Sequence, residues 1–221
     1  MRLRHSQPAA PAGRPFTLIE LLTVMLIAGI MLAITVPVVV KITSGSSVEA
    51  ASRMIGAQLR LARQEAIVKR RRVAILFPAN EAVGVPEEAR FLGFRACYVD
   101  DNDEWTAWVE NTVWTYVPVG AVIAEVDDDN GIQWTGSAPQ QPRDDTTKIV
   151  KNVDGTMANE SRAVIFRPTG RVGLQFSVSI VEGAVIPSGG TATVQAKNRD
   201  NWIDVRANQY TGRVSFVRPG V

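Results

Sequence analysis

The most prominent pattern in the chain is an apolar run near its N-terminus. Residues Leu21 to Val40 carry no charged side chain, and only Thr23, Thr35 and Pro37 interrupt the apolar, alanine and glycine residues. About 20 residues of α-helix span the roughly 30 Å hydrocarbon core of a bilayer. The run therefore predicts a transmembrane helix. Glu20 is anomalous there, because a carboxylate costs on the order of 2–3 kcal/mol at the bilayer centre and somewhat less near an end.

A second pattern follows, with the spacing of an amphipathic helix. Six small or apolar residues are separated by three or four positions, which places them on one face of a helix. They are Val48, Ala51, Ile55, Leu59, Ala62 and Ala66. This stripe predicts the half of a long helix that packs on a globular domain. The polar residues 41–47 before it either unwind the helix or restart it, and Ser46 and Glu49 fit a capping box at such a start.

From Val73 onward the pattern changes to short β-type runs separated by turn residues. We expect two strands between residues 105 and 126, a polar loop over 136–162 and a turn region over 183–190. The other expected strands are residues 73–77, 91–99, 163–166, 172–181, 191–196, 202–207 and 213–217. A long helix followed by these strands predicts an α+β protein.

Charge and histidine content restrict the classes of function that the chain can have. The formal net charge is +2, but residues 1–15 hold three of the 24 basic residues and none of the 22 acidic ones. The remaining chain is close to neutral, which disfavours a general polyanion binder. His5 is the only histidine and lies in the same segment, which argues against histidine-dependent catalysis and most zinc sites. We therefore expect neither an enzyme nor a bound cofactor or metal.

Acidic and aromatic groups each have a functional and a structural interpretation. Residues 100–104 and 127–129 are rich in aspartate and could hold calcium, but they lack EF-hand spacing, and aspartate is also an ordinary turn residue. The five tryptophans, at positions 105, 108, 114, 134 and 202, could bind a sugar or a partner; the structural interpretation, half-buried sheet residues, is favoured. Cys97 is the only cysteine, and its place in an expected strand is typical of a small buried residue.

The N-terminal segment resembles the signal of type IV pilins and type II secretion pseudopilins. The resemblance lies in Phe16-Thr-Leu-Ile-Glu20-Leu, preceded by a short basic leader and followed by the apolar run. It implies cleavage by a prepilin peptidase between Pro15 and Phe16, followed by N-terminal methylation. It also implies that Glu20 pairs with the terminal amine of a neighbouring subunit, and that Pro37 loosens the helix. The family usually has glycine before the cut, where this chain has Pro15.

The order of the later motifs is similar to the H-type minor pseudopilins and the FimT-like minor pilins. These motifs are residues 61–67, Val73-Ala-Ile-Leu, Val164-Ile-Phe-Arg-Pro-Thr-Gly170 and Thr211-Gly-Arg-Val214. The resemblance implies a pilin-like fold, a long N-terminal helix packed on an antiparallel β domain. It divides the chain into a leader (1–15), a transmembrane or filament-core helix half (16–41), an amphipathic helix half (42–72) and a β-rich domain (73–221).

The function that the resemblance implies is that of a minor pseudopilin, a structural subunit of a type II secretion pseudopilus. Its expected partners are the prepilin peptidase, the membrane and other pseudopilin or pilin subunits. We expect a single-pass inner-membrane protein with its C-terminal domain on the periplasmic side, which is then incorporated into the filament.

The alternative is a FimT-like minor type IV pilin that acts in pilus assembly or DNA uptake. Members of that branch linked to DNA uptake carry a pair of basic residues in the C-terminal segment; Arg213 matches the first, while Ser215 stands at the second and Arg218 follows. Lys69, Arg70, Arg71 and Arg72 could also contact phosphates. Their structural interpretation, favoured here, is that cations complement the C-terminal end of a helix dipole.

Overall fold

The structure is a computed structural model that describes residues 17–80, 82, 85–127, 149–155, 161–173, 176–188 and 191–218. Within these ranges the side chains of residues 33–45, 127, 149, 188 and 199 are not described. Contacts divide the chain into two compact units, Met1–Ile42 and Thr43–Val221. The second unit contains all the strands that the structure describes.

Helix α1, Leu18–Lys69, passes through both patterns found in the sequence. It is helical across residues 41–47, so the predicted restart at Ser46 is wrong; Glu49 instead forms ion pairs with Arg53 and Arg218. The helix ends before Arg70, which has a φ of 51° and takes the left-handed conformation common after a helix.

The first unit contains the N-terminal part of α1. Large apolar side chains from Leu18 to Leu32 are exposed there. Among the residues with described side chains, which leave out 33–45, no helix is both long and apolar enough to cross a membrane. The predicted span Leu21–Val40 falls partly on the omitted residues and stays a prediction.

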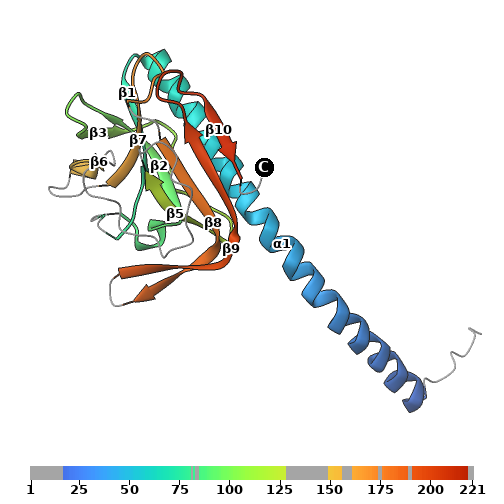
Figure 1. Cartoon of the computed structure of the whole chain (residues 1–221). Helices are drawn as coiled ribbons and strands as arrows, with labels where there is room; N and C mark the ends of the chain where they lie inside the picture. The colour runs from blue at the N-terminus through green and yellow to red at the C-terminus, as the bar shows by residue number, and fades with distance from the viewer. Residues whose placement is uncertain are drawn as a thin grey trace, which may run out of the picture. The chain divides into compact units, whose positions relative to one another are not determined.

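The second unit is built from two antiparallel sheets (Figure 1). The first has the order β3-β2-β1-β7-β6, with β4 also paired to β2, and the second has the order β10-β9-β8-β5. In the first sheet the strands are β1 (Arg72–Phe77), β2 (Gly93–Val99), β3 (Trp105–Trp108), β4 (Thr115–Tyr116), β6 (Ile149–Val150) and β7 (Ser161–Phe166). In the second they are β5 (Ala121–Asp127), β8 (Phe176–Ser188), β9 (Thr191–Ala207) and β10 (Val214–Val217). Two short 3-10 turns, Glu87–Ala89 and Val153–Gly155, lie in the connections.

The main core forms where the predicted helical stripe meets both sheets. All six stripe residues are at most 3 % exposed. They share one cluster with alternate residues of β1, such as Val73 and Ile75, and with Phe176 and Val205 from the second sheet. Alternation of side chains along a strand places these residues on one face of each sheet. The predicted α+β class, with an N-terminal helix packed on antiparallel strands, is confirmed.

The opposite faces of the sheets are also covered. Trp105, Trp108 and Trp114 pack edge to face, with ring centroids 5.8 and 5.9 Å apart, over a second cluster that includes Cys97. Trp202 lies in a third cluster beside the second sheet and is 7 % exposed. The interpretation as half-buried sheet residues is confirmed for Trp105 and Trp108 of β3. Trp202 lies in β9 but is buried, Trp114 precedes β4, and Trp134 lies outside the described residues. Cys97 is fully buried, as expected, and burial raises the pKa of its thiol.

The strand predictions fail mainly in the second sheet. The expected turn region over residues 183–190 is wrong, because Gly183–Ser188 continues β8. The expected strands 191–196 and 202–207 are one strand, β9, whose pairing with β8 shifts register around Glu182. Such a bulge lets one long strand change direction without ending. Two further differences are that residues 105–126 form three strands, and that β6 and a 3-10 turn lie within the expected polar loop.

Strand β10 lies along one side of α1 (Figure 1). A Cβ atom at Gly56 would lie 2.7 Å from the ring of Phe216, so only glycine allows this approach without a shift of the ring. Farther along the helix, the Arg63 Nε donates to the Gly170 carbonyl over 3.1 Å. Gly212 packs against both groups with a φ of 62°. Two of the sequence motifs, which end in Gly170 and contain Gly212, are thus the turns that dock on the helix.

We predict that Gly212→Ala destabilises the second unit by on the order of 3 kcal/mol, because the new Cβ would lie 2.0 Å from the Gly170 carbonyl oxygen at a left-handed φ. Thermal unfolding of the full chain in detergent, followed by tryptophan fluorescence, measures the loss. Gly155→Ala is the matched control, since Gly155 has a φ of 70° and open space around it. It should cost only about 1 kcal/mol. Equal losses in the two variants would contradict the docking role.

Candidate functional site

Glu20 lies in the first turn of α1, where its main chain is capped by Thr17. The Glu20 amide donates to the Thr17 carbonyl over 3.1 Å and to the Thr17 hydroxyl over 3.3 Å. Both residues are exposed. A threonine three positions before a glutamate is the sequence signature of a capping box, and an acid in the first turn complements the helix dipole. Thr17 therefore caps the start of α1, a local structural role that our sequence interpretation missed.

The other residues of the predicted signal lie wholly or partly outside the described structure. Pro15 and Phe16 lie outside the described residues, and Pro37 lies within α1 with its side chain not described. Their predicted roles in cleavage, methylation and assembly stay predictions.

The basic segment at the end of α1 is not a uniform patch. Lys69 and Arg70 are exposed. Arg71 lies with its guanidinium carbon 4.3 Å from the centroid of the Tyr98 ring and donates to the Thr106 hydroxyl over 3.4 Å. The four side chains therefore lie in different environments: Lys69 and Arg70 are exposed, whereas Arg71 and Arg72 make side-chain contacts.

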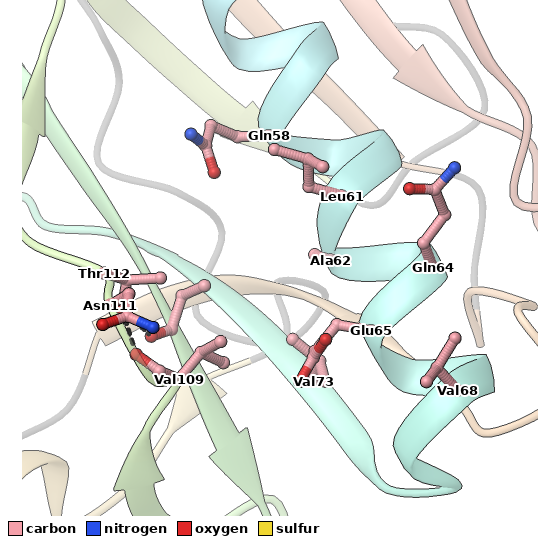
Figure 2. Close-up of a pocket in the computed structure, with 11 residues that line it drawn as sticks. Gln58, Leu61, Ala62, Gln64, Glu65, Val68, Val73, Val109, Asn111 and Thr112 are labelled. Atoms are coloured by element: carbon pink, nitrogen blue, oxygen red, sulfur yellow. Dashed lines mark hydrogen bonds between the residues drawn. The ribbon is translucent and has the colours of Figure 1, made fainter.

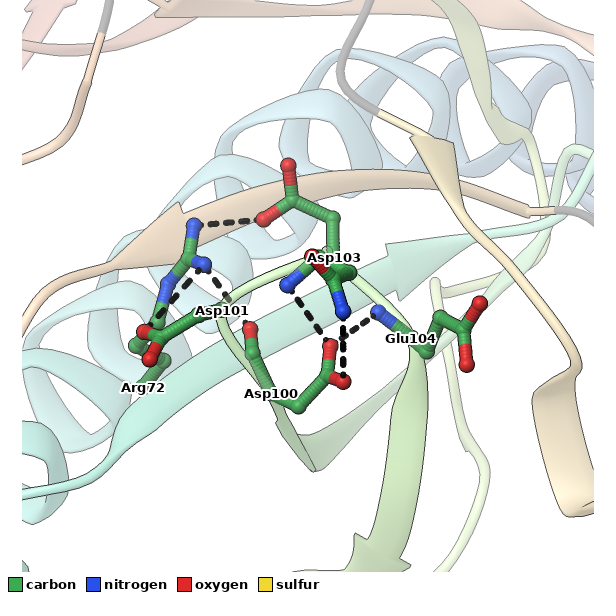
Figure 3. A network of polar contacts seen from close by, with 6 residues as sticks. Arg72, Asp100, Asp101, Asp103 and Glu104 are labelled. Carbon is green, nitrogen blue, oxygen red and sulfur yellow. Dashed lines mark hydrogen bonds and ion pairs between the residues drawn. The ribbon is translucent and has the colours of Figure 1, made fainter.

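Arg72, the first residue of β1, contacts the acidic turn between β2 and β3 (Figure 3). Its Nη1 donates to the Asp100 carbonyl over 2.8 Å, and its Nη2 pairs with Asp103 at 2.5 Å. The arginine side chain is 16 % exposed and that of Asp103 is 18 % exposed. Arg72 thus fixes this turn, and the suggestion that it contacts nucleic acid is not favoured by its surroundings.

The Asp100 carboxylate of the same turn binds main-chain amides rather than a metal centre. Asp100 Oδ1 accepts hydrogen bonds from the Asn102 amide over 2.9 Å and from the Glu104 amide over 2.8 Å (Figure 3). In the part of the chain that the structure describes, no three acidic, histidine or cysteine side chains come together as metal ligands. Asp128 and Asp129, of the second acidic cluster, lie outside that part.

The two C-terminal cations lie at separate places on α1. Arg213 is exposed and follows Gly212, which packs against Arg63. Arg218 pairs with Glu49 at 3.0 Å. Glu49 precedes Arg63 by fourteen positions, about 21 Å of helix, so the structure does not join Arg213 and Arg218 into one site. Hydrogen bonds from Arg218, and then from Arg53, hold the pKa of the Glu49 carboxyl below its usual value.

A groove runs beside the other side of α1, between the helix and the segment that follows β3 (Figure 2). Its volume is about 410 Å³. Gln58, Leu61, Gln64, Glu65 and Val68 line it from the helix, with Val109, Asn111 and Thr112 across from them and Ala62, Val73 and Ala96 at its base. Leu61 is 55 % exposed and Val68 74 % exposed. The sequence pattern does not predict this groove, because the groove depends on the position of the segment after β3.

Tyr98 and Glu65 form a polar contact beside the groove. The Tyr98 hydroxyl donates to Glu65 Oε1 over 2.6 Å, and the Tyr98 side chain is otherwise part of the main core. Burial, followed by the hydrogen bond to the Glu65 carboxylate, raises the pKa of Tyr98 to about 12. Tyr98 therefore stays neutral at ordinary pH and keeps Glu65 in place.

Comparison with known proteins assigns the second unit to a family. The family model described as type II transport protein GspH matches residues 51–210. A comparison with curated proteins gives no match. Among solved structures, the chain is similar to the minor pseudopilin EpsH of the Vibrio cholerae type 2 secretion system, with 14 % identity and a TM-score of 0.43 over 79 % of this chain and 99 % of that one. It is also similar to the type IV minor pilin FimU of Pseudomonas aeruginosa, with 14 % identity and a TM-score of 0.41 over 78 % of this chain and 89 % of that one.

We predict that Arg72→Ala lowers the free energy of unfolding by about 2–3 kcal/mol, because it removes the half-buried ion pair with Asp103 and the hydrogen bond to the Asp100 carbonyl. Lys69→Ala should change it by less than about 0.5 kcal/mol, since Lys69 is exposed at the helix end. Guanidinium denaturation of the full chain in detergent measures both. Similar values for the two variants would show that Arg72 does not hold the turn.

Proposed function

The chain belongs to the family of type II transport protein GspH, the H-type minor pseudopilins, and from this we propose how it is processed and assembled. The match over residues 51–210 carries the proposal. In it, the chain is a structural subunit of a type II secretion pseudopilus. Helix α1 supplies the assembly element, and the β domain is the part displayed outside the membrane.

The precursor is a single-pass inner-membrane protein with its β domain on the periplasmic side. The apolar run Leu21–Val40 and the basic residues before it support this arrangement, because cations favour the cytoplasmic end of a membrane segment. A prepilin peptidase removes residues 1–15, and the new amine at Phe16 is methylated. The exposed apolar side chains between Leu18 and Leu32 support a role in contacts with lipid and then with other subunits.

Assembly uses one charge pair in addition to apolar packing. The Glu20 carboxylate of one subunit meets the terminal amine of a neighbour, which offsets the cost of placing each charge in an apolar surrounding. What supports this proposal is that the Thr17 cap engages the main-chain amide of Glu20 rather than its carboxylate, and that Glu20 is exposed. The pair sets the axial position of one subunit relative to the next.

We predict that Glu20→Gln leaves membrane insertion intact and sharply reduces incorporation into filaments. Glutamine at this position preserves a capping-box side chain but removes the charge. Thr17→Ala is the complementary control, because it removes the cap hydroxyl and keeps the charge, and it should assemble normally. Immunoblots of sheared filaments, beside carbonate-extracted membranes, measure the two quantities. Normal incorporation of Glu20→Gln would rule out the charge pair.

A separate prediction concerns the residue before the cut. Because proline lacks an amide hydrogen and restricts the backbone, Pro15→Gly should raise the fraction of chains that begin at Phe16. Mass spectrometry of the N-terminus in isolated membranes measures that fraction. Gly13→Ala should leave it unchanged. A mature N-terminus at another residue in both variants would contradict the proposed cleavage site.

A further inference from the structure

The part of α1 in the second unit has two flanks, and the rest of the chain packs against only one of them. At 100° per residue, Glu49, Gly56, Arg60 and Arg63 lie to one side of the buried stripe, and Gln58, Leu61, Glu65 and Val68 lie to the other. Strand β10 and the turns at Gly170 and Gly212 pack against the first side, which we call the covered flank. The second side, which we call the open flank, borders the groove.

The open flank combines exposed apolar side chains with a groove large enough to hold side chains of another molecule. Leu61 and Val68 project at 55 % and 74 % exposure above a groove of about 410 Å³ (Figure 2). That volume lies within the usual range of ligand pockets, roughly 300–1,000 Å³, and holds a few apolar side chains. Exposed apolar side chains beside a concavity rimmed by polar groups are typical of an interaction surface.

Glu65 is the one charged residue among those that line the groove, and the exposed Glu110 lies between the lining residues Val109 and Asn111. Lys69, four positions after Glu65, places an exposed cation at the end of the helix, so the acidic part of the rim is the part formed by Glu65 and Glu110. Glu110 is exposed and close enough to contribute to the raised pKa of Tyr98. The nearby cation Arg71 is held over the Tyr98 ring and donates to Thr106. An occupant of this groove would therefore gain from a basic residue next to its apolar ones.

The outer surface of the covered flank carries cations and aromatic rings, which are complementary to the acidic and apolar residues beside the groove. Phe216 is 41 % exposed with the Arg60 guanidinium 5.7 Å from its ring centroid, and Tyr210 is 69 % exposed. Arg213 is exposed between them in sequence. One side of the unit thus presents acids beside an apolar groove, and the other presents cations beside aromatic rings. Two different, complementary faces on one subunit produce a head-to-tail contact, which propagates as an open helical filament rather than closing as a dimer.

We propose that the open-flank groove receives the basic, aromatic flank of the adjacent pilin-type subunit in the filament. Leu61 and Val68 form the apolar centre of the contact, and Glu65 and Glu110 pair with its cations. This inference rests on the proposed function, since it requires assembly with other subunits. It adds a second contact in the globular unit to those made by the apolar half of α1.

The test places a benzoylphenylalanine photocrosslinker at single positions of the full chain in cells that assemble filaments. Leu61 and Val68 probe the groove. Met25, which is 69 % exposed, probes the N-terminal half of α1, and Ile186, which is 45 % exposed on β8, is a control away from the groove. We expect adducts with a pilin-type subunit from Met25, Leu61 and Val68 but not from Ile186. Peptide mapping should place the groove adducts on a segment with aromatic and basic residues.

The outcomes separate this inference from the proposed function. Adducts from Met25 without adducts from Leu61 and Val68 would overturn the groove contact and leave assembly in place. No adduct with a pilin-type subunit at any position would overturn both. Groove adducts with a secreted protein, or with an acidic segment of a subunit, would also overturn the proposal.

A charge variant tests the acidic rim directly. Glu110→Lys should reduce the yield of the Leu61 adduct about threefold to tenfold, because it places a cation opposite the cations of the partner. Glu88→Lys makes the same change of charge at an exposed position in the turn before β2 and should leave the yield unchanged. Equal yields from the two variants would overturn the charge pairing.

Discussion

The fold of the second unit depends on the buried stripe of α1. Its six residues include three alanines, and small side chains let the helix lie close to both sheets at once. The two sheets are not joined into one, but both pack on the stripe in a single core, where Phe77 of β1 also stacks on Phe176 of β8. Loss of contact along this stripe would expose apolar residues of both sheets together. The close approach of β10 at Gly56 and the two turns at Arg63 extend the same constraint to the side of the helix.

The two flanks of the helix beside this stripe make different contacts. On the covered flank, contacts come from the chain itself, through Phe216, Gly212 and Arg218. On the open flank, the Tyr98–Glu65 hydrogen bond lies beside apolar groups that the chain leaves exposed. The two flanks of one subunit are therefore different, because the chain packs on one of them and leaves the other exposed. A filament subunit requires such a difference, because each subunit meets its neighbours through different faces.

Much of the architecture could be predicted from the sequence, because it follows from local periodicity. The stripe from Val48 to Ala66 and the strand at residues 73–77 are encoded in adjacent residues, and both were found. The hairpin of β8 and β9 was not, because Gly183, Pro187 and Ser188 resemble turn residues, and pairing with the neighbouring strand β9 keeps them extended. The same limit applies to the site. The pairing of Arg72 with Asp103 and the groove at Leu61 depend on contacts between elements, whereas the Thr17 cap on Glu20 was visible as a local motif and was overlooked.

Strand β10 also has a consequence for the order in which the chain matures. It packs on a part of α1 that precedes it by many residues in the sequence. During synthesis, the Gly56 surface stays without Phe216 until about 160 further residues have followed. This side of the helix is therefore completed only after β10 has been made. Until then, the apolar surface around Gly56 is open to solvent or to other chains.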